Sequence, residues 1–132
     1  KLKKINDLDL ATVVMKTKKG LQCIITNSRH CSFGYDQRIE LFGTKGMIIS
    51  DNQRDLETVL YSKNSTDKKT QLKNFFIERY SEAYKIQLND LVKICKKSSK
   101  PLANFDDGEK SLILAEIAKK SLKTKRFETI TF

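Results

Sequence analysis

The sequence predicts an α+β fold, a mostly antiparallel, open-faced sheet with two helices on one face. Short alternating apolar runs separated by turn residues fill the first half, which is typical of strands. In the second half, apolar residues recur every three or four positions over two long segments, which is typical of amphipathic helices. Strands followed by helices, without βαβ alternation, favour an antiparallel sheet.

Five strands are expected in the first half, at Leu10–Thr17, Leu21–Asn27, Arg38–Phe42, Met47–Ile49 and Leu56–Tyr61. Gly20 marks a turn between the first two, which predicts a hairpin. The segment GTKG turns the chain between the third and fourth. The polar run over residues 63–70 follows the fifth strand and is expected to be a loop.

Two helices and a last strand are expected in the second half. The first helix runs from Leu72 to about Ser98, and Pro101 follows a few residues beyond its end. The second begins at Asp106, a good N-cap residue, with Glu109 three positions on as in a capping box. The segment Phe127–Phe132 alternates and predicts a final strand.

The face of this sheet away from the helices must be solvated or covered by another subunit or domain. Val14, Ile24 and Phe42 can give it apolar character. We therefore expect a homo-oligomer, a dimer or tetramer, that packs through this sheet face.

The composition describes one ordinary globular domain over residues 1–132. Hydrophobic residues make up 39% and charged residues 32%. No apolar run approaches the about 20 residues of a membrane span, and KLKKI is not followed by the apolar region of a signal peptide. An odd set of three cysteines, without a CxxC pair, favours a reducing cytoplasm. A single histidine makes a metal site an unfavourable interpretation. Because the chain begins with Lys1, we expect a piece of something longer.

The net charge of +10 raises nucleic acid as a partner. Of the 26 basic residues 21 are lysines, scattered along the whole chain, and only five are arginines. Base readers favour arginine, and single-strand binders interleave basic and aromatic residues. The charge therefore indicates a solvated lysine-rich surface rather than a nucleic-acid site.

Chemistry-bearing patterns are few. The five glycines form neither a GxGxxG fingerprint nor a Walker A loop. His30 and Cys31 are adjacent, and adjacent residues on an extended strand point to opposite faces, so they make a poor nucleophile pair. No catalytic residue is expected in this chain.

The segment Phe33-Gly34-Tyr35-Asp36-Gln37-Arg38 is the strongest candidate site. Gly34 permits a tight bend between two aromatic residues. Tyr35 offers a flat ring and a hydroxyl that donates and accepts, and the three polar residues after it suit a polyhydroxylated ligand. From the residues alone, the alternative is a structural turn in which Tyr35 packs and Asp36 pairs with Arg38.

This segment also carries a resemblance. NSRHCSFGYDQRIELFGTKGMIISDN resembles the C-terminal domain of the glucose–fructose oxidoreductase and inositol dehydrogenase family, and within it the inositol 2-dehydrogenases. The opening strand of that domain resembles Ile5–Ala11, its long helix FFIERYSEAY and its last helix DDGEKSLILAEIAKKS. The resemblance covers nearly the whole chain.

The resemblance implies an NAD-dependent dehydrogenase that oxidises a secondary hydroxyl of a cyclitol, with hydride passing to the nicotinamide. It implies that an N-terminal Rossmann domain, outside this chain, binds NAD and supplies a catalytic Lys, and that a catalytic Asp and His precede this chain. This chain alone is then expected to be inactive. Tyr35 would border the bound polyol and Phe33 would form a wall, where inositol dehydrogenases often have Tyr; Gly34, Asp36 and Arg38 would shape the loop.

Three other interpretations remain open. Within the family, the substrate could be a sugar rather than an inositol. The chain could be a stand-alone, non-catalytic oligomerisation domain, which solution mass and the full gene sequence would reveal. A basic anion or nucleic-acid binder would show salt-dependent binding to polynucleotides.

Overall fold

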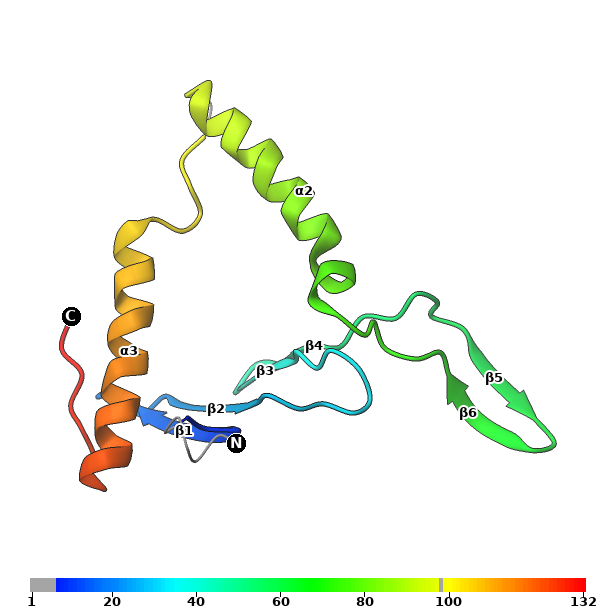
Figure 1. Cartoon of the computed structure of the whole chain (residues 1–132), viewed down its shortest axis with the longest axis horizontal. Helices are drawn as coiled ribbons and strands as arrows, with labels where there is room; N and C mark the ends of the chain where they lie inside the picture. Colours follow the sequence, from blue (N-terminus) through cyan, green and yellow to red (C-terminus); the bar gives the residue numbers. More distant parts are fainter. Residues whose placement is uncertain (1–6, 98) are drawn as a thin grey trace. The chain divides into compact units, whose positions relative to one another are not determined.

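The computed structural model describes residues 7–97 and 99–132. Within them, six strands precede two long helices along the chain, and this order can be followed by colour in Figure 1. The predicted α+β class is confirmed. Residues 5 and 6 of the expected opening strand, and Ser98 at the expected end of the first helix, lie outside the described residues.

The chain divides into two compact units. One contains the chain up to Ala11 together with Asn27–Ile86, and the other contains Thr12–Thr26 together with Gln87–Phe132. The first unit holds the candidate segment around Tyr35 and two strand pairs. The second holds most of the first strand pair, the last helix and the C-terminal segment.

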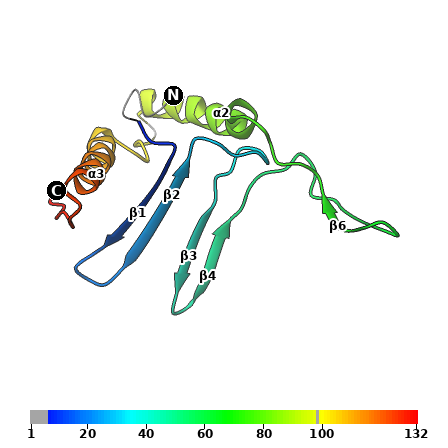
Figure 2. The same cartoon turned by 60° about the horizontal axis from the view of Figure 1, so that its bottom comes forward.

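The first predicted hairpin is present. Strands β1 (Leu10–Lys16) and β2 (Gln22–Ser28) form a two-stranded sheet, in which they run in opposite directions (Figure 2). The amide of Thr17 donates to the carbonyl of Leu21 (2.9 Å) at the turn. The paired hydroxyls of Thr12 and Thr26, 3.3 Å apart, lie across the strands. Threonine pairs of this kind are a stabilising cross-strand contact.

The second hairpin is apolar on both faces. Strands β3 (Ile39–Gly43) and β4 (Gly46–Ser50) pair antiparallel, with Leu41 opposite Ile48 and Phe42 opposite Met47. Because successive side chains alternate between faces, these two apolar pairs lie on opposite sides of the ribbon. Strands that are apolar on both faces are typical of sheets covered on both sides.

The third hairpin corrects the sequence prediction of a loop over residues 63–70. Strand β5 (Val59–Ser62) pairs antiparallel with β6 (Ser65–Lys69), and Leu60 lies opposite Lys68. The polar run conceals the strand because β6 carries almost no apolar residue to alternate. Its backbone hydrogen bonds to β5, rather than a buried face, make it a strand.

Helix α2 (Phe76–Cys95) begins four residues later than expected. Leu72 forms an isolated antiparallel bridge with Arg54, and the amide of Lys73 donates to the carbonyl of Gln53 (3.1 Å). These extended residues cannot join the helix. At its start, the carboxylate of Glu78 accepts from the amide of Asn74 (3.0 Å), which satisfies a donor before the first turn.

Helix α3 (Phe105–Thr124) begins at a different cap from the one expected. Asn104, not Asp106, is the N-cap residue. Its side chain accepts from the amide of Asp107 (3.1 Å), and the Asp107 carboxylate accepts from the amide of Asn104 (2.9 Å). The capping box is therefore real but lies two residues earlier. Asp107 takes the role that the sequence pattern gave to Glu109.

Replacing Asn104 with alanine is expected to lower the free energy of unfolding by about 1 kcal/mol, because the first turn loses its side-chain acceptor. Asp106→Ala, which removes only a favourable charge near the helix start, should cost a few tenths, about 0.3 kcal/mol. Urea denaturation of both variants, in the full-length gene product, measures the two losses. A larger loss for Asp106→Ala would contradict the observed cap.

The predicted final strand at residues 127–132 is wrong, since no strand among the described residues pairs with this segment. Side chains of α3 hold its first part instead. Ser121 Oγ donates to the carbonyl of Arg126 (2.7 Å), and the Glu128 carboxylate accepts from Lys120 Nζ (2.7 Å) and Thr124 Oγ1 (2.8 Å). Alternation alone does not make a strand without a partner ladder.

Large apolar side chains stay exposed on several elements. No apolar side chain in the described part of the chain is buried. Exposed fractions reach 67% at Ile24, 69% at Ile48 and 84% at Phe42. None of the described helices is long and apolar enough to cross a membrane.

Candidate functional site

The candidate segment is anchored by a glycine turn within the first unit. Gly34 is buried and adopts a φ of +125°, a conformation that residues with a Cβ rarely adopt. A Cβ placed on it would lie 2.9 Å from the Leu72 Cβ and 3.1 Å from the Lys73 carbonyl oxygen. The amide of Tyr35 donates to that same carbonyl (2.8 Å). The segment is therefore fastened to the chain just ahead of α2.

Tyr35 packs against an aromatic side chain of α2. Its ring meets that of Tyr80 edge to face, with centroids 5.6 Å apart and planes at 80°. One helical turn further on, the Tyr84 ring lies 6.3 Å from Tyr80 at 64°. Edge-to-face pairs of this kind are a favoured aromatic geometry. The Tyr80 hydroxyl donates to Gln37 Oε1, so the helix and the turn are linked by a hydrogen bond as well.

The pKa of Tyr35 is raised above its ordinary value of 10.0. The larger cause is hydrogen bonding with Tyr80, and the smaller is partial desolvation. The phenol is therefore neutral throughout the physiological range. A neutral phenol can both donate and accept a hydrogen bond. It is therefore suited to binding a hydroxyl group of a ligand rather than to acting as a charged group.

The three residues after Tyr35 are fixed by a charged cluster. The Arg38 guanidinium donates two hydrogen bonds to the Asp36 carboxylate, from Nε to Oδ1 (2.7 Å) and from a terminal nitrogen to Oδ2 (3.0 Å). Asn52 Nδ2 donates to the same Oδ1 (2.6 Å), and Asn52 Oδ1 accepts from the amide of Gln37 (2.7 Å). Hydrogen bonds from Arg38, and to a lesser extent from Asn52, stabilise the ionised carboxylate of Asp36. The pKa of Asp36 is therefore lowered from 3.8.

This lowered pKa predicts an acid-dependent loss of stability. A carboxylate with a depressed folded pKa contributes stability above its unfolded value, near 3.8, and loses it as the pH falls through the folded value. Asp36→Asn should therefore be less stable than wild type at pH 7, and the gap should close below about pH 4. Urea midpoints of the full-length gene product from pH 7 to pH 3 measure it. Arg38→Gln, which breaks the same pair, should follow the same profile, and a gap constant with pH would contradict the prediction.

The other sequence candidates lie apart from this cluster. Phe33 is 60% exposed and precedes the Gly34 bend. His30 Nε2 lies 3.3 Å from Asp9 Oδ1 at an exposed position, where both groups are ordinary surface partners. Sequence reasoning missed the roles of Tyr80 and Asn52. Tyr80 was visible only as one apolar position of a helix, and nothing local links Asn52 to Asp36, 16 residues earlier.

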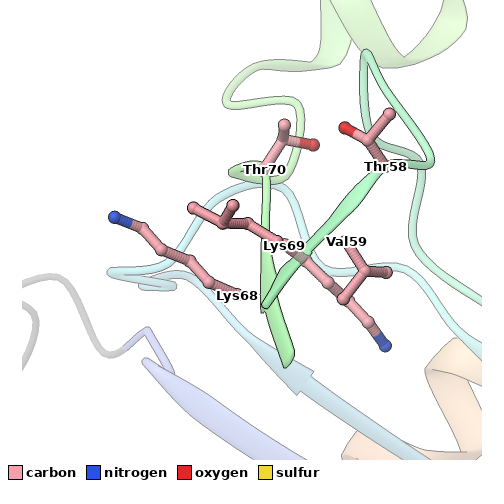
Figure 3. Close-up of a pocket in the computed structure, with 6 residues that line it drawn as sticks. Thr58, Val59, Lys68, Lys69 and Thr70 are labelled. Carbon is pink, nitrogen blue, oxygen red and sulfur yellow. The ribbon is translucent and has the colours of Figure 1, made fainter. Parts of the chain in front are cut away.

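Two cavities lie elsewhere. A depression of about 360 Å³ on the β5–β6 hairpin is lined by Thr58, Val59, Leu60, Lys68, Lys69 and Thr70. Figure 3 shows the Lys68 and Lys69 side chains leaving it in opposite directions. A groove of about 480 Å³ lies in the second unit, between β1, α3 and the C-terminal segment. Tyr35 and Phe33 line neither cavity.

The described part of the chain can be compared with what a metal ion or a dinucleotide requires. Across residues 7–97 and 99–132, no three His, Cys, Asp or Glu side chains lie close enough together to bind a metal ion. The glycines provide no dinucleotide-binding loop. These residues therefore do not fit an NAD site of the Rossmann type.

Comparison with known proteins identifies the class to which this architecture belongs. A model of the GFO/IDH/MocA C-terminal domain matches residues 1–49. The chain is 42% identical over 123 residues to a myo-inositol 2-dehydrogenase of Thermotoga maritima, covering 93% of this chain and 36% of that protein. It is 35% identical to an inositol 2-dehydrogenase of Rhizobium meliloti, covering 91% of this chain and 36% of that protein.

The solved structures agree. A myo-inositol dehydrogenase from Corynebacterium glutamicum matches 99% of this chain with a TM-score of 0.89 and 38% identity, over 39% of its own length. The chain is therefore similar, over nearly its whole length, to the C-terminal domain of the GFO/IDH/MocA oxidoreductases. The three relatives named here are inositol dehydrogenases by name. The chain spans about a third of the length of these curated relatives (36%).

Proposed function

We propose that this chain lines the substrate pocket of an NAD-dependent oxidoreductase that oxidises a secondary hydroxyl of a cyclitol, with myo-inositol as the substrate. The observation that carries the proposal is the fastened turn around Tyr35. A neutral phenol is held there by Gly34, Lys73 and Tyr80, and two of the relatives named above are inositol 2-dehydrogenases.

The role of Tyr35 is to bind and orient. Its hydroxyl can accept from, or donate to, one hydroxyl of a polyol. The exposed ring of Phe33, two residues earlier in the sequence, would cover an apolar C–H face of the substrate ring. Holding the substrate in one orientation lowers the activation free energy, because translational and rotational freedom is lost on binding and not in the chemical step. Asp36, Arg38 and Asn52 hold the backbone of the turn and need not touch the substrate.

The groups that accept the proton and the hydride belong to the rest of the full-length protein in this proposal. NAD would be held there by a Rossmann domain, because the residues of this chain do not fit that group. The 132-residue chain alone is then inactive. The free thiols of Cys23, Cys31 and Cys95 support a reducing, cytoplasmic location.

Homo-oligomerisation through the sheet is part of the proposal. The β3–β4 hairpin carries Leu41 and Ile48 on one face and Phe42 and Met47 on the other. One apolar face can be covered by the same domain and the second by another subunit. Exposed apolar surface of this kind marks interaction sites. The same surface also fits the alternative of a stand-alone oligomerisation domain. The other alternative, a sugar dehydrogenase of the same family, would differ from an inositol dehydrogenase only in its substrate pocket.

Tyr35→Phe in the full-length gene product tests the substrate role. We expect kcat/KM for myo-inositol to fall about two- to tenfold, because one neutral hydrogen bond, about 0.5–1.5 kcal/mol, is lost. Tyr61→Phe, at an exposed tyrosine of β5, is the matched control and should behave as wild type. Unchanged kcat and KM in Tyr35→Phe would contradict the proposal that the Tyr35 hydroxyl contacts the substrate.

A further inference from the structure

The β5–β6 hairpin has two unlike edges. Among the described strands, β5 and β6 form a two-stranded sheet of their own (Figure 1), so each has one edge without a strand partner there. On β6, Asp67 has a φ of +55° and lies where the register between the two strands shifts, which marks a β-bulge. Lys68 and Lys69 follow it. Bulges and lysines are the usual protection of an edge strand against pairing with another chain.

The β5 edge carries no such protection. The strand Val59–Ser62 contains no charged residue and no proline. The base of the hairpin is held in place, because Thr70 Oγ1 donates to the carbonyl of Leu56 (2.8 Å) and Arg54 donates to the carbonyl of Thr70. An unprotected edge on a hairpin that is held at its base is a template for a further strand.

The sequence around this edge is complementary to itself. Two copies of β5 can run antiparallel with Leu60 of one copy opposite Leu60 of the other. The remaining pairs between the copies are then Val59 with Tyr61, Thr58 with Ser62 and Glu57 with Lys63. Pairs of β-branched with aromatic residues, of hydroxyl residues and of opposite charges are the cross-strand contacts that stabilise antiparallel sheets. Each unlike pair occurs twice, because a two-fold contact is reciprocal.

The charged pair selects the partner. Glu57 and Lys63 flank β5 at exposed positions, and no ion pair joins either of them to another described residue. A strand of a different protein would have to supply a cation and a carboxylate at the same six-residue spacing. A second copy of this chain supplies both by symmetry.

We propose that β5 pairs antiparallel with β5 of a second copy of this chain, centred on Leu60, which joins two hairpins into one four-stranded sheet. This edge contact is distinct from the packing through the β3–β4 faces given above and does not depend on it. Tyr61→Phe keeps the ring that meets Val59 of the second copy, so it remains a suitable control for kinetics.

Charge reversal in the full-length gene product tests the contact. Glu57→Lys brings two cations together at both ends of the paired strands, and Lys63→Glu brings two carboxylates together there. We expect each variant alone to raise the dissociation constant of the assembly, measured by sedimentation, about five- to thirtyfold. An equimolar mixture of the two variants should return toward the wild-type value, because each mixed pair brings opposite charges together at both ends. Glu116→Lys and Lys110→Glu make the same charge changes at exposed positions of α3 and should leave the constant unchanged.

Hydrogen exchange locates the contact. The amides of residues 58–62 should exchange more slowly as the wild-type protein is concentrated, and Glu57→Lys should shift this protection to higher concentrations. Protection that is equal at every concentration would mean that a strand of the same full-length chain covers the edge, which would overturn the proposal.

Three further results would also overturn it. They are a wild-type protein that stays monomeric, a dissociation constant unchanged in both charge variants, and a mixture that does not recover. An unchanged constant in a protein that does assemble would leave the packing through β3–β4 intact. None of these results bears on the substrate role of Tyr35.

Discussion

Gly34→Ala is expected to lower the free energy of unfolding by about 2–6 kcal/mol. Two costs add at this position. A non-glycine residue at φ +125° is strained by about 1–3 kcal/mol. The new methyl would also lie 2.9 Å from the Leu72 Cβ and 3.1 Å from a backbone oxygen, and overpacking of this kind costs about 1–3 kcal/mol.

Gly46→Ala is the matched control, because it separates the two costs. Gly46 has a φ of +140° in the β3–β4 turn, yet nothing lies within 4 Å of the position that its new methyl would take. This variant should therefore show only the cost of backbone strain, about 1–3 kcal/mol. Urea denaturation of both variants in the full-length gene product measures the difference. Equal losses would mean that the close approach of Gly34 to Leu72 does not matter.

Tyr80→Ala is expected to lower the free energy of unfolding by about 2–3 kcal/mol. Removing a buried aromatic ring costs about 3–5 kcal/mol, and the half-buried position of Tyr80 reduces that figure. The variant loses the edge-to-face contact with Tyr35, the ring contact with Tyr84 and the hydrogen bond to Gln37.

Tyr61→Ala provides the comparison, since its side chain on β5 is 67% exposed. A surface change of this kind should stay within about 0.5 kcal/mol. Thermal and urea unfolding of the two variants decide between a structural link at Tyr80 and an ordinary surface aromatic. Similar small losses in both would show that the aromatic contact does not fasten the turn to α2.

Strands with strong alternation were predictable, and strands defined by their partners were not. The β3–β4 hairpin follows directly from Ile39 and Leu41, the turn GTKG and the apolar run after it. Strand β6 carries lysines where alternation needs apolar residues, so only pairing with β5 reveals it. Phe127–Phe132 shows the reverse case, an alternating segment without a partner among the described strands.

The helices were predictable in extent and less so at their ends. Periodic apolar positions place both α2 and α3, but a cap depends on which side chain folds back onto the first turn. Asn104 and Asp107 form the capping box two residues before the position that Asp106 and Glu109 suggested. Both pairs satisfy the same spacing rule, so spacing alone cannot choose between them.

The sequence predicted the local segment of the candidate site, but not the residues from elsewhere in the chain that contact it. The need for Gly34 and the pairing of Asp36 with Arg38 lie within five consecutive residues, where local chemistry is visible. Asn52 and Tyr80 join the cluster from 16 and 43 residues further along the chain than their partners Asp36 and Gln37. Contacts at such separations come from the fold, which no local pattern encodes.

The most direct measurement is myo-inositol-dependent reduction of NAD⁺ by the full-length gene product, run beside the 132-residue chain. If this chain lines the pocket of an inositol dehydrogenase, the full-length protein turns over and the isolated chain does not. Absence of turnover by the full-length protein with myo-inositol would contradict the account.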